Sequence, residues 1–169
     1  MRYTPAAAAL ALLVAVTASV SHSAPAQPLD PRAAALVQQG RAALAGGNAD
    51  GAIDAFESAL AIQPGHVAIY LNLAEASRKQ GMQGKALHYY REALELEPDN
   101  QFAIAGEGMA LVEKGATEKA KRNLARLEQL CGNANCAPAK DLAAAIAKGP
   151  APQVVSADQV KAEPQVTAN

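Results

Sequence analysis

The sequence predicts an all-α protein, an α-solenoid of three helical hairpins followed by a C-terminal capping helix. Three observations lead to this fold class. Half of the 169 residues are hydrophobic but only 4% are aromatic, so the apolar residues are mostly alanine and leucine, which favours closely packed helices. No run of β-branched or aromatic residues alternates in the manner of a strand. Similar residues also recur at a fixed distance along the chain.

The N-terminal segment is predicted to be a secretory signal peptide. Arg2 is the only charged residue among the first 29, and it precedes a largely apolar run of 15 residues from Ala6 to Val20. A short basic end, a hydrophobic core and small residues at a cleavage site are typical of such signals, whereas a membrane span needs about 20 apolar residues. Cleavage after Ala26 or after Ser23 fits this pattern. We therefore expect export to the periplasm, with secretion or an uncleaved membrane anchor as alternatives.

The rest of the chain resembles itself at a shift of 34 residues. The first two copies align Ala52, Phe56, Ala59 and Pro64 with Ala86, Tyr90, Ala93 and Pro98. A second shift reaches Ala120, Leu124 and Leu127, and the upstream glycines Gly47, Gly81 and Gly115 share one register. The proline position falls on Gly132 in the third copy, which makes that copy looser. Self-similarity at this period indicates a repeat protein.

This period, with its small, aromatic and proline positions, resembles the tetratricopeptide repeat family. The resemblance covers residues 33–132 and divides them into repeats 33–66, 67–100 and 101–132. It implies a right-handed solenoid. Residues 27–32 would form a short linker before the first repeat.

Glycines and prolines set the predicted ends of six helices. Gly47, Gly81 and Gly115 lie where the first helix of each pair must stop, because glycine takes the left-handed conformation without a Cβ penalty. Pro64 and Pro98 end second helices, because proline cannot continue the helical hydrogen bonds. The predicted helices are 31–45, 50–62, 66–80, 84–96, 100–114 and 117–131.

Both ends of the array carry predicted capping features. Asp30 and Pro31 suit the cap and the first turn of the first helix. At the other end an open apolar face needs a cover, and residues 136–148 would supply it as a capping helix that Gly149 terminates. Residues 149–169 show no sustained period and are predicted to form a flexible tail.

Cys131 and Cys136 lie across a predicted tight turn between the last repeat helix and the capping helix. Two cysteines this close are expected to form a disulfide in an oxidising compartment, which would hold the capping helix with about 2 kcal/mol. A thiol-redox or redox-sensing role is the alternative, although the spacing is not Cys-x2-Cys. His66 and His88 show no ligand spacing to the cysteines, so no metal site is predicted.

No set of residues in the sequence predicts catalysis. A His-Glu-x2-His motif, a phosphate loop and a nucleophile elbow are all missing from the chain. The net charge of −1 and the lack of a basic stretch argue against nucleic-acid binding. We expect a non-enzyme with no cofactor, no nucleic-acid partner and no small-molecule substrate, and the oligomeric state stays open.

In the tetratricopeptide repeat family, the first helix of each repeat lines a concave groove that receives an extended peptide or a partner helix. The resemblance therefore implies a partner-binding groove formed by Gln38, Arg41, Leu71, Asn72, Glu75, Arg78, Phe102 and Met109, with Val37, Leu44 and Val112 beside them. Asn72 matches a position where the family often places an asparagine that hydrogen-bonds a peptide backbone. The family's cationic clamp for a terminal carboxylate is absent, because Val37, Phe102 and Gly106 occupy its positions.

This groove predicts a non-catalytic scaffold or adaptor in the bacterial cell envelope that holds a segment of another protein. Apolar contacts would come from Leu71, Phe102 and Met109, and charged side chains would set the register of the partner. For Phe102 and Met109, packing against the neighbouring helices is the alternative.

Overall fold

The computed structural model describes residues 28–132 and 135–150. Within these ranges the chain forms seven α-helices and no strand. They are α1 (Pro31–Ala45), α2 (Ala49–Ile62), α3 (Val67–Lys79), α4 (Gln83–Leu96), α5 (Gln101–Glu113), α6 (Thr117–Cys131) and α7 (Ala137–Lys148). Each helix begins and ends within one residue of its predicted position. The all-α fold class is confirmed.

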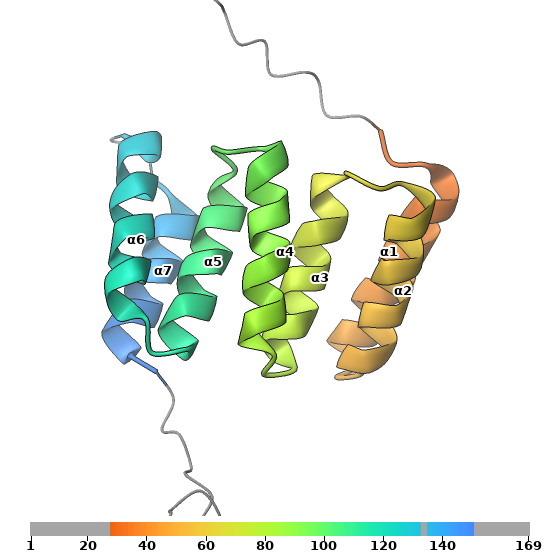
Figure 1. The fold of residues 1–169 in the computed structure, drawn as a ribbon, viewed down its shortest axis with the longest axis horizontal. Helices are drawn as coiled ribbons and strands as arrows, with labels where there is room; N and C mark the ends of the chain where they lie inside the picture. Colours follow the sequence, from red (N-terminus) through yellow and green to blue (C-terminus); the bar gives the residue numbers. More distant parts are fainter. Residues whose placement is uncertain (1–27, 133–134, 151–169) are drawn as a thin grey trace, which may run out of the picture.

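The helices form three antiparallel hairpins that stand side by side in one row, as an α-solenoid (Figure 1). The hairpins are α1–α2, α3–α4 and α5–α6, and the second helices α2, α4 and α6 lie in front in this view. Neighbouring hairpins touch because α3 packs on α2 and α5 packs on α4. α7 follows at the end of the row and packs against both α5 and α6. The first helices α1, α3 and α5 therefore lie next to one another behind the second helices.

The turn inside each hairpin depends on a glycine with positive φ. Gly47, Gly81 and Gly115 have φ angles of +80°, +80° and +81°. In the first turn the N–H of Asn48 then donates to the carbonyl of Ala43 at 2.9 Å, which satisfies a carbonyl at the helix end. The predicted left-handed glycines are confirmed at all three turns.

Small residues bring the helices of the array close together. The repeat alanines Ala52, Ala59, Ala86, Ala93 and Ala120 are completely buried. Two further close approaches place glycine under an aromatic ring: a Cβ on Gly40 would lie 2.4 Å from the Phe56 ring, and one on Gly106 would lie 2.3 Å from the Tyr90 ring. The aromatic residues of the repeats therefore fill the space that these glycines leave open.

Helix α7 covers the face that the third repeat leaves open. Leu142 of α7 is completely buried and belongs to the same core cluster as residues of α4, α5 and α6. A Cβ on Gly108 of α5 would lie 2.6 Å from the Leu142 Cδ2 atom, so this helix also sits on a glycine. A second core cluster joins α1, α2 and α3. The two clusters together run through the whole row.

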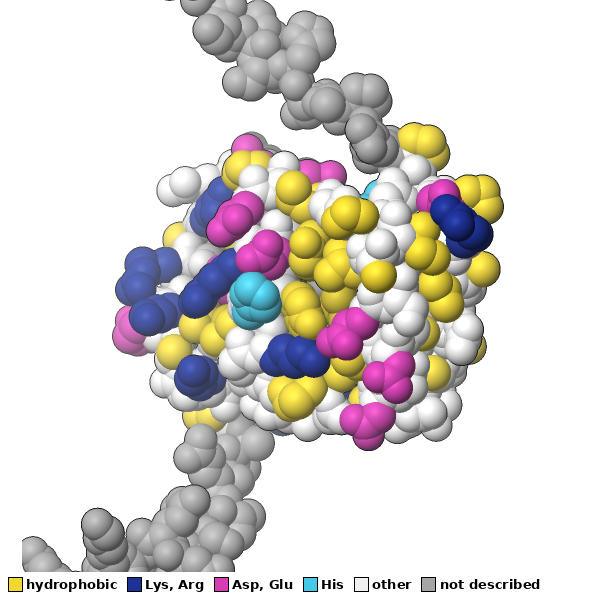
Figure 2. Space-filling model, turned by 45° about the vertical axis from the view of Figure 1, so that its right-hand side comes forward, with side chains coloured by type: hydrophobic (Ala, Val, Ile, Leu, Met, Phe, Trp, Pro, Cys, Tyr) yellow, Lys and Arg dark blue, Asp and Glu magenta, His cyan; other side chains and the backbone are white. Residues whose placement is uncertain are grey.

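The surface mixes hydrophobic, acidic and basic side chains on the face that Figure 2 presents. Basic side chains gather toward the left of this view, while acidic side chains are spread over the face, at the lower right and also beside the basic ones. In the described part of the chain, no helix is long and apolar enough to cross a membrane. The predicted signal peptide, and the predicted tail beyond Pro150, lie outside the described residues.

Candidate functional site

The predicted groove residues lie on the first helices α1, α3 and α5, but they differ in accessibility. Three of them are exposed, namely Gln38, Arg41 and Phe102. The other five are half-buried, namely Leu71, Asn72, Glu75, Arg78 and Met109. Leu71 and Met109 pack against the core cluster of α4 to α7. The alternative of packing against neighbouring helices therefore holds in part for Met109.

Two residues expected beside the groove belong to the core. Val37 is 3% exposed and packs in the cluster of α1, α2 and α3, while Val112 is 2% exposed and packs in the cluster of α4 to α7. The prediction that they line the groove is wrong, because both side chains are buried in the hydrophobic core. Leu44 is half-buried against the first cluster.

A hydrogen bond links two of the predicted groove residues, Arg41 of α1 and Asn72 of α3. The Nε of Arg41 donates to the Oδ1 of Asn72 at 3.1 Å, and the Nδ2 of Asn72 donates to the carbonyl of Ala68. Both polar atoms of Asn72 are thus engaged within the chain. The guanidinium of Arg41 is exposed and keeps its other N–H groups for further acceptors.

An ion-pair cluster joins α3 and α5 near their C-terminal ends. Arg78 donates to both carboxylate oxygens of Glu75 at 3.0 Å and also to Glu113 on α5. Burial opposes the charged form of Arg78, but Glu75 and Glu113 outweigh it and raise the pKa of the guanidinium. The sequence analysis did not predict a role for Glu113. The feature that could have indicated one is its position 35 residues after Arg78, about one repeat away, with the opposite charge.

Tyr90 joins this cluster from α4. Its hydroxyl donates to the Oε2 of Glu75 at 3.3 Å. Burial, followed by the charge of Glu75, raises the pKa of this phenol above its ordinary range. The Tyr90 ring lies against Gly106, which stands at the position where a basic clamp residue would be. The aromatic ring therefore occupies the space next to that position.

Phe102 is the most exposed large hydrophobic residue in the described part of the chain. Its side chain is 69% exposed, compared with 46% for Leu96 and 38% for Leu130. It stands in the first turn of α5, a helix composed mainly of apolar residues. The other large apolar residues of this helix are buried or half-buried. The alternative that Phe102 packs against neighbouring helices is wrong.

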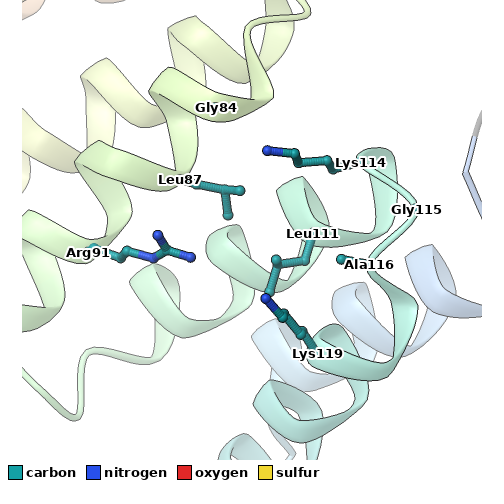
Figure 3. Close-up of a pocket in the computed structure, with 8 residues that line it drawn as sticks. All are labelled: Gly84, Leu87, Arg91, Leu111, Lys114, Gly115, Ala116 and Lys119. Atoms are coloured by element: carbon teal, nitrogen blue, oxygen red, sulfur yellow. The ribbon is translucent and has the colours of Figure 1, made fainter.

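A separate pocket lies between α4, the α5–α6 turn and α6 (Figure 3). We call it the basic pocket, and it has a volume of about 450 Å³. Its lining residues are Gly84, Leu87, Arg91, Leu111, Lys114, Gly115, Ala116 and Lys119. The sequence analysis named only one of these residues, Gly115, and only as a turn glycine.

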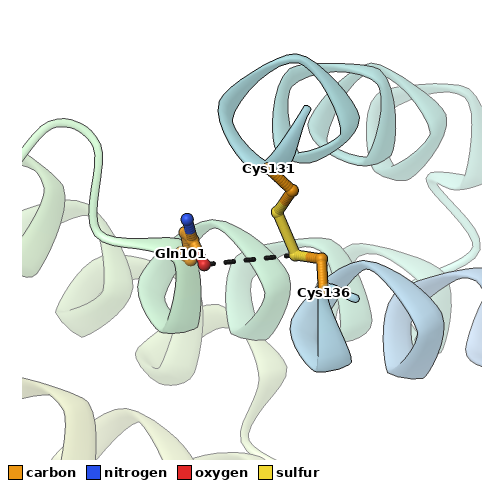
Figure 4. Close-up of a disulfide and its surroundings, with 3 residues drawn as sticks. All are labelled: Gln101, Cys131 and Cys136. Carbon is orange, nitrogen blue, oxygen red and sulfur yellow. Dashed lines mark hydrogen bonds between the residues drawn. A yellow bond between two sulfur atoms is a disulfide. The ribbon is translucent and has the colours of Figure 1, made fainter. Parts of the chain in front are cut away.

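The two cysteines lie at the junction of α6 and α7 (Figure 4). The structure places their sulfur atoms at bonding distance, 2.08 Å, with the two Cα atoms 5.9 Å apart. Cys136 Sγ is also 4.0 Å from the Oε1 of Gln101 on α5. In residues 28–132 and 135–150, no three His, Cys, Asp or Glu side chains are grouped so that they could hold a metal ion.

Solved structures of known proteins share this architecture. The Sgt2 TPR domain from Aspergillus fumigatus is 25% identical, with a TM-score of 0.64 over 78% of this chain and 93% of that one. The first TPR of Spaghetti (RPAP3), bound to an HSP90 peptide, is 22% identical, with a TM-score of 0.61 over 69% and 91%. The TPR2B domain of yeast Sti1, in complex with pHsp70, is 18% identical, with a TM-score of 0.65 over 70% and 96%.

The sequence itself also matches a known family. No curated protein sequence is significantly similar to the chain. The model of a tetratricopeptide repeat family matches residues 5–66 and 37–101, which together are more than half of the chain. The first match extends into the apolar N-terminal segment, and the looser third repeat lies almost entirely beyond the second match. On this match and on the three helical hairpins, the chain belongs to the tetratricopeptide repeat family.

Proposed function

We propose that this protein is a non-catalytic scaffold or adaptor that holds a segment of a partner protein against α1, α3 and α5. The observation that carries the proposal is the 69% exposure of Phe102 on α5. At the same register position the first two repeats have Ala34 and Ala68, so the aromatic ring is an addition to a small-residue position. An exposed aromatic side chain beside polar neighbours is typical of a binding anchor.

The polar groups of the groove indicate which kind of partner segment it can bind. Arg78 pairs with both Glu75 and Glu113, which leaves this cluster with a net charge of about −1 and no attraction for an acidic segment. Arg41 has free N–H groups and Gln38 is exposed, and both can donate to carbonyl oxygens of an extended chain. We infer a partner segment with an apolar side chain for Phe102 and a backbone that accepts hydrogen bonds from Arg41.

Structural relatives support a peptide as the kind of partner. The first TPR of Spaghetti (RPAP3) is bound to an HSP90 peptide, and the second TPR domain of human RPAP3 is in complex with an HSP70 peptide. A tetratricopeptide repeat domain of this size can therefore hold a peptide. The basic clamp positions differ here, so the sequence of the bound segment should differ as well.

We also propose that the protein works in the bacterial cell envelope. The basic start, the apolar run from Ala6 to Val20 and the small residues after it support export. The test is cell fractionation followed by N-terminal sequencing of the purified protein. The proposal expects a periplasmic protein that begins at Gln27 or Ala24, and a cytoplasmic protein that retains Arg2 would contradict it.

Co-purification from envelope extracts tests the groove. We would compare the wild type with Phe102→Ala and with the double variant Arg41→Ala, Asn72→Ala. A matched control is Leu130→Ala, which removes an exposed apolar side chain from α6, outside the groove. The expected result is a specific partner retained by the wild type and by Leu130→Ala but lost from both groove variants. Identical partner lists from all four proteins would refute the groove assignment.

A further inference from the structure

We propose that the basic pocket between α4 and α6 is a second docking site, and that it binds an acidic peptide segment with an apolar residue between its acidic residues. This inference goes beyond the proposed function, because the pocket is lined by α4, the C-terminal end of α5 and α6, and shares no residue with the predicted groove. Its evidence and its test are also independent of Phe102.

The pocket combines an apolar floor with a cationic rim. Leu87 of α4 and Leu111 of α5 form the floor, and each is 5% exposed. Arg91, Lys114 and Lys119 come from α4, the end of α5 and α6, and their cationic groups point into the space between these elements (Figure 3). A volume of about 450 Å³ is within the range of ligand-binding pockets, about 300 to 1,000 Å³.

The positive charge of the pocket is only partly neutralised within the chain. Arg91 donates through Nε to the Oε1 of Glu107 at 3.1 Å, and Glu107 also accepts from Asn123. Within the described residues, Lys114 and Lys119 have neither a hydrogen bond nor an ion pair from their side chains. Three cations therefore face one carboxylate, which leaves a net charge of about +2 for an anionic ligand.

The repeat symmetry shows what the pocket is missing. The equivalent junction between α2 and α4 is found by subtracting 34 from each residue number. Under this shift Gly84, Arg91, Lys114 and Lys119 correspond to Asp50, Glu57, Gln80 and Lys85. Two acidic residues of the first junction are thus replaced by a glycine and an arginine in the second.

In the first junction these acidic residues satisfy their polar neighbours. Lys85 Nζ lies 3.0 Å from the Oε1 of Glu57, and this hydrogen bond raises the pKa of the lysine. Gln80 donates through Nε2 to the Oδ1 of Asp50. Lys119 and Lys114 occupy the corresponding places without such partners. In the first junction the chain itself provides the two carboxylates, from Asp50 and Glu57. We infer that in the second junction a bound ligand provides them.

The spacing of the missing carboxylates indicates the form of the ligand. Asp50 and Glu57 are seven residues apart on α2, which is about 10 Å along a helix at about 1.5 Å per residue. An extended peptide covers the same distance in about three residues. Ile53 stands between them in the first junction, where Leu87 stands in the second. Because side chains of an extended chain alternate between two faces, an acidic, an apolar and a second acidic residue at positions i, i+2 and i+4, about 13 Å from first to last, place all three side chains toward the pocket.

The α5–α6 turn does not offer a backbone cradle for a phosphate group. Its N–H groups already donate within the turn, from Lys114 to Ala110, from Gly115 to Val112 and from Ala116 to Leu111. Anion recognition therefore falls to the flexible side chains of the rim. The apolar floor of Leu87 and Leu111 can also hold an apolar side chain of a peptide, which an inorganic ion does not offer.

The test uses a fluorescein-labelled peptide with the core Asp-Ser-Leu-Ser-Glu and its neutral analogue Asn-Ser-Leu-Ser-Gln. The pocket variant is the double substitution Lys114→Gln, Lys119→Gln. The control, Lys79→Gln with Lys140→Gln, removes two exposed lysines of α3 and α7 and changes the net charge equally. A third variant, Gly84→Asp, places a carboxylate opposite Lys114 in the way that Asp50 stands opposite Gln80. A Cβ at Gly84 meets no atom within 4 Å, so this variant should fold.

The acidic peptide should bind the wild type, the Lys79 and Lys140 control, and the groove variant Phe102→Ala with equal affinity. Its affinity should fall about tenfold in the pocket variant, since two exposed ion pairs are worth about a factor of ten together. Gly84→Asp should also weaken it, and added salt should weaken it in the wild type. On titration, the methyl NMR signals of Leu87 and Leu111 should shift.

Four results would overturn the proposal. They are equal binding by the pocket variant and its control, equal binding of the neutral peptide, methyl shifts at Leu71 and Met109 instead of the pocket leucines, and displacement of the peptide by an equal concentration of inorganic phosphate. The third result would assign the peptide to the groove, and the fourth would reduce the pocket to a simple anion site. Because Phe102 is intact in the pocket variant, each of these results tests the pocket separately from the proposed binding of a partner by Phe102.

Discussion

Glycine at positions 40 and 106 determines where the aromatic residues of the repeats can pack. Gly40 lies inside α1, where alanine would be favoured by about 1 kcal/mol on helix propensity alone. A Cβ there would lie 2.4 Å from the completely buried Phe56 ring, and overpacking of this kind costs about 1 to 3 kcal/mol. The identity of these residues is therefore set by a contact between helices and not by the helix that contains them.

Gly40→Ala should lower the free energy of unfolding by about 1 to 2 kcal/mol, because the overpacking outweighs the gain in propensity. Urea unfolding followed by circular dichroism measures it. Gly84→Ala is the matched control: it lies in α4 with no atom within 4 Å of its Cβ, so it should stabilise the protein by up to about 1 kcal/mol. Equal stabilisation by both substitutions would contradict the packing of Phe56 on Gly40.

Tyr90 should make the stability of the protein depend on alkaline pH. Burial raises the pKa of its hydroxyl in the folded state, so above the unfolded value of about 10 the unfolded chain loses this proton first. The contribution is complete below pH 10 and is lost as the pH rises toward the folded pKa. Tyr90→Phe should therefore lose about 1 kcal/mol at pH 7, with the hydrogen bond to Glu75.

The difference between wild type and Tyr90→Phe should stay constant up to about pH 10 and narrow as the pH rises above that value, when the free energy of unfolding is measured by urea titration at each pH. Tyr89→Phe is a useful comparison, since burial also raises the pKa of Tyr89 but its hydroxyl faces Glu57 on the surface. A difference that stays constant with pH for Tyr90→Phe would show that this phenol titrates equally in both states.

At the scale of the element, α7 depends on the third repeat and on the cysteine junction. The completely buried Leu142 holds the helix on α5, and the bond between Cys131 and Cys136 stays a prediction that the sulfur positions favour. Closing so short a loop stabilises the folded state by about 2 kcal/mol in the chain-entropy model. The disulfide is therefore expected to hold α7 in place without being required for the fold.

Reduction of Cys131–Cys136 should lower the free energy of unfolding by about 2 kcal/mol. It should also accelerate hydrogen exchange in α7 while leaving α2 unchanged, because the two helices belong to different core clusters. Thiol titration of the exported, denatured protein should find no free thiol before reductant is added. Ready cycling with a physiological dithiol, with little change in stability, would instead favour a redox function.

The ends of the helices could be predicted from the sequence because local residues determine them. Gly47, Gly81 and Gly115 alone give the turns, and Pro64 and Pro98 follow the second helices, so short-range rules were sufficient. These positions also carry the 34-residue period. The correct repeat number followed from the same residues.

The residues that line the groove could be predicted only in part, because contacts between helices determine which side chains stay accessible. Val37 and Val112 have half-buried counterparts in the second repeat, Leu71 and Arg78, yet both valines belong to the core. Asn72 was expected to meet a partner, but Arg41 from the preceding repeat already engages it. No sequence pattern marks Lys114, which the structure places at one pocket with Lys119, five residues away.

At the scale of the whole molecule, the solenoid presents two chemically different surfaces. The first helices offer Phe102 beside an ion-pair cluster with a net charge of about −1, and α4, the end of α5 and α6 offer a pocket with unpaired lysines. Because the hairpins pack into one continuous row, both surfaces are held in fixed relation to each other. A partner could therefore contact one surface without disturbing the other.

The central claim is that the groove on the first helices holds a partner segment. Its most direct test is photo-crosslinking in living cells, with a photoreactive phenylalanine analogue in place of Phe102 and, as a control, in place of the exposed Ala61 on α2. The account predicts a discrete crosslinked species from position 102 that disappears in the Arg41→Ala, Asn72→Ala background, and none from position 61. Identical crosslinked species from both positions, or none from position 102, would contradict it.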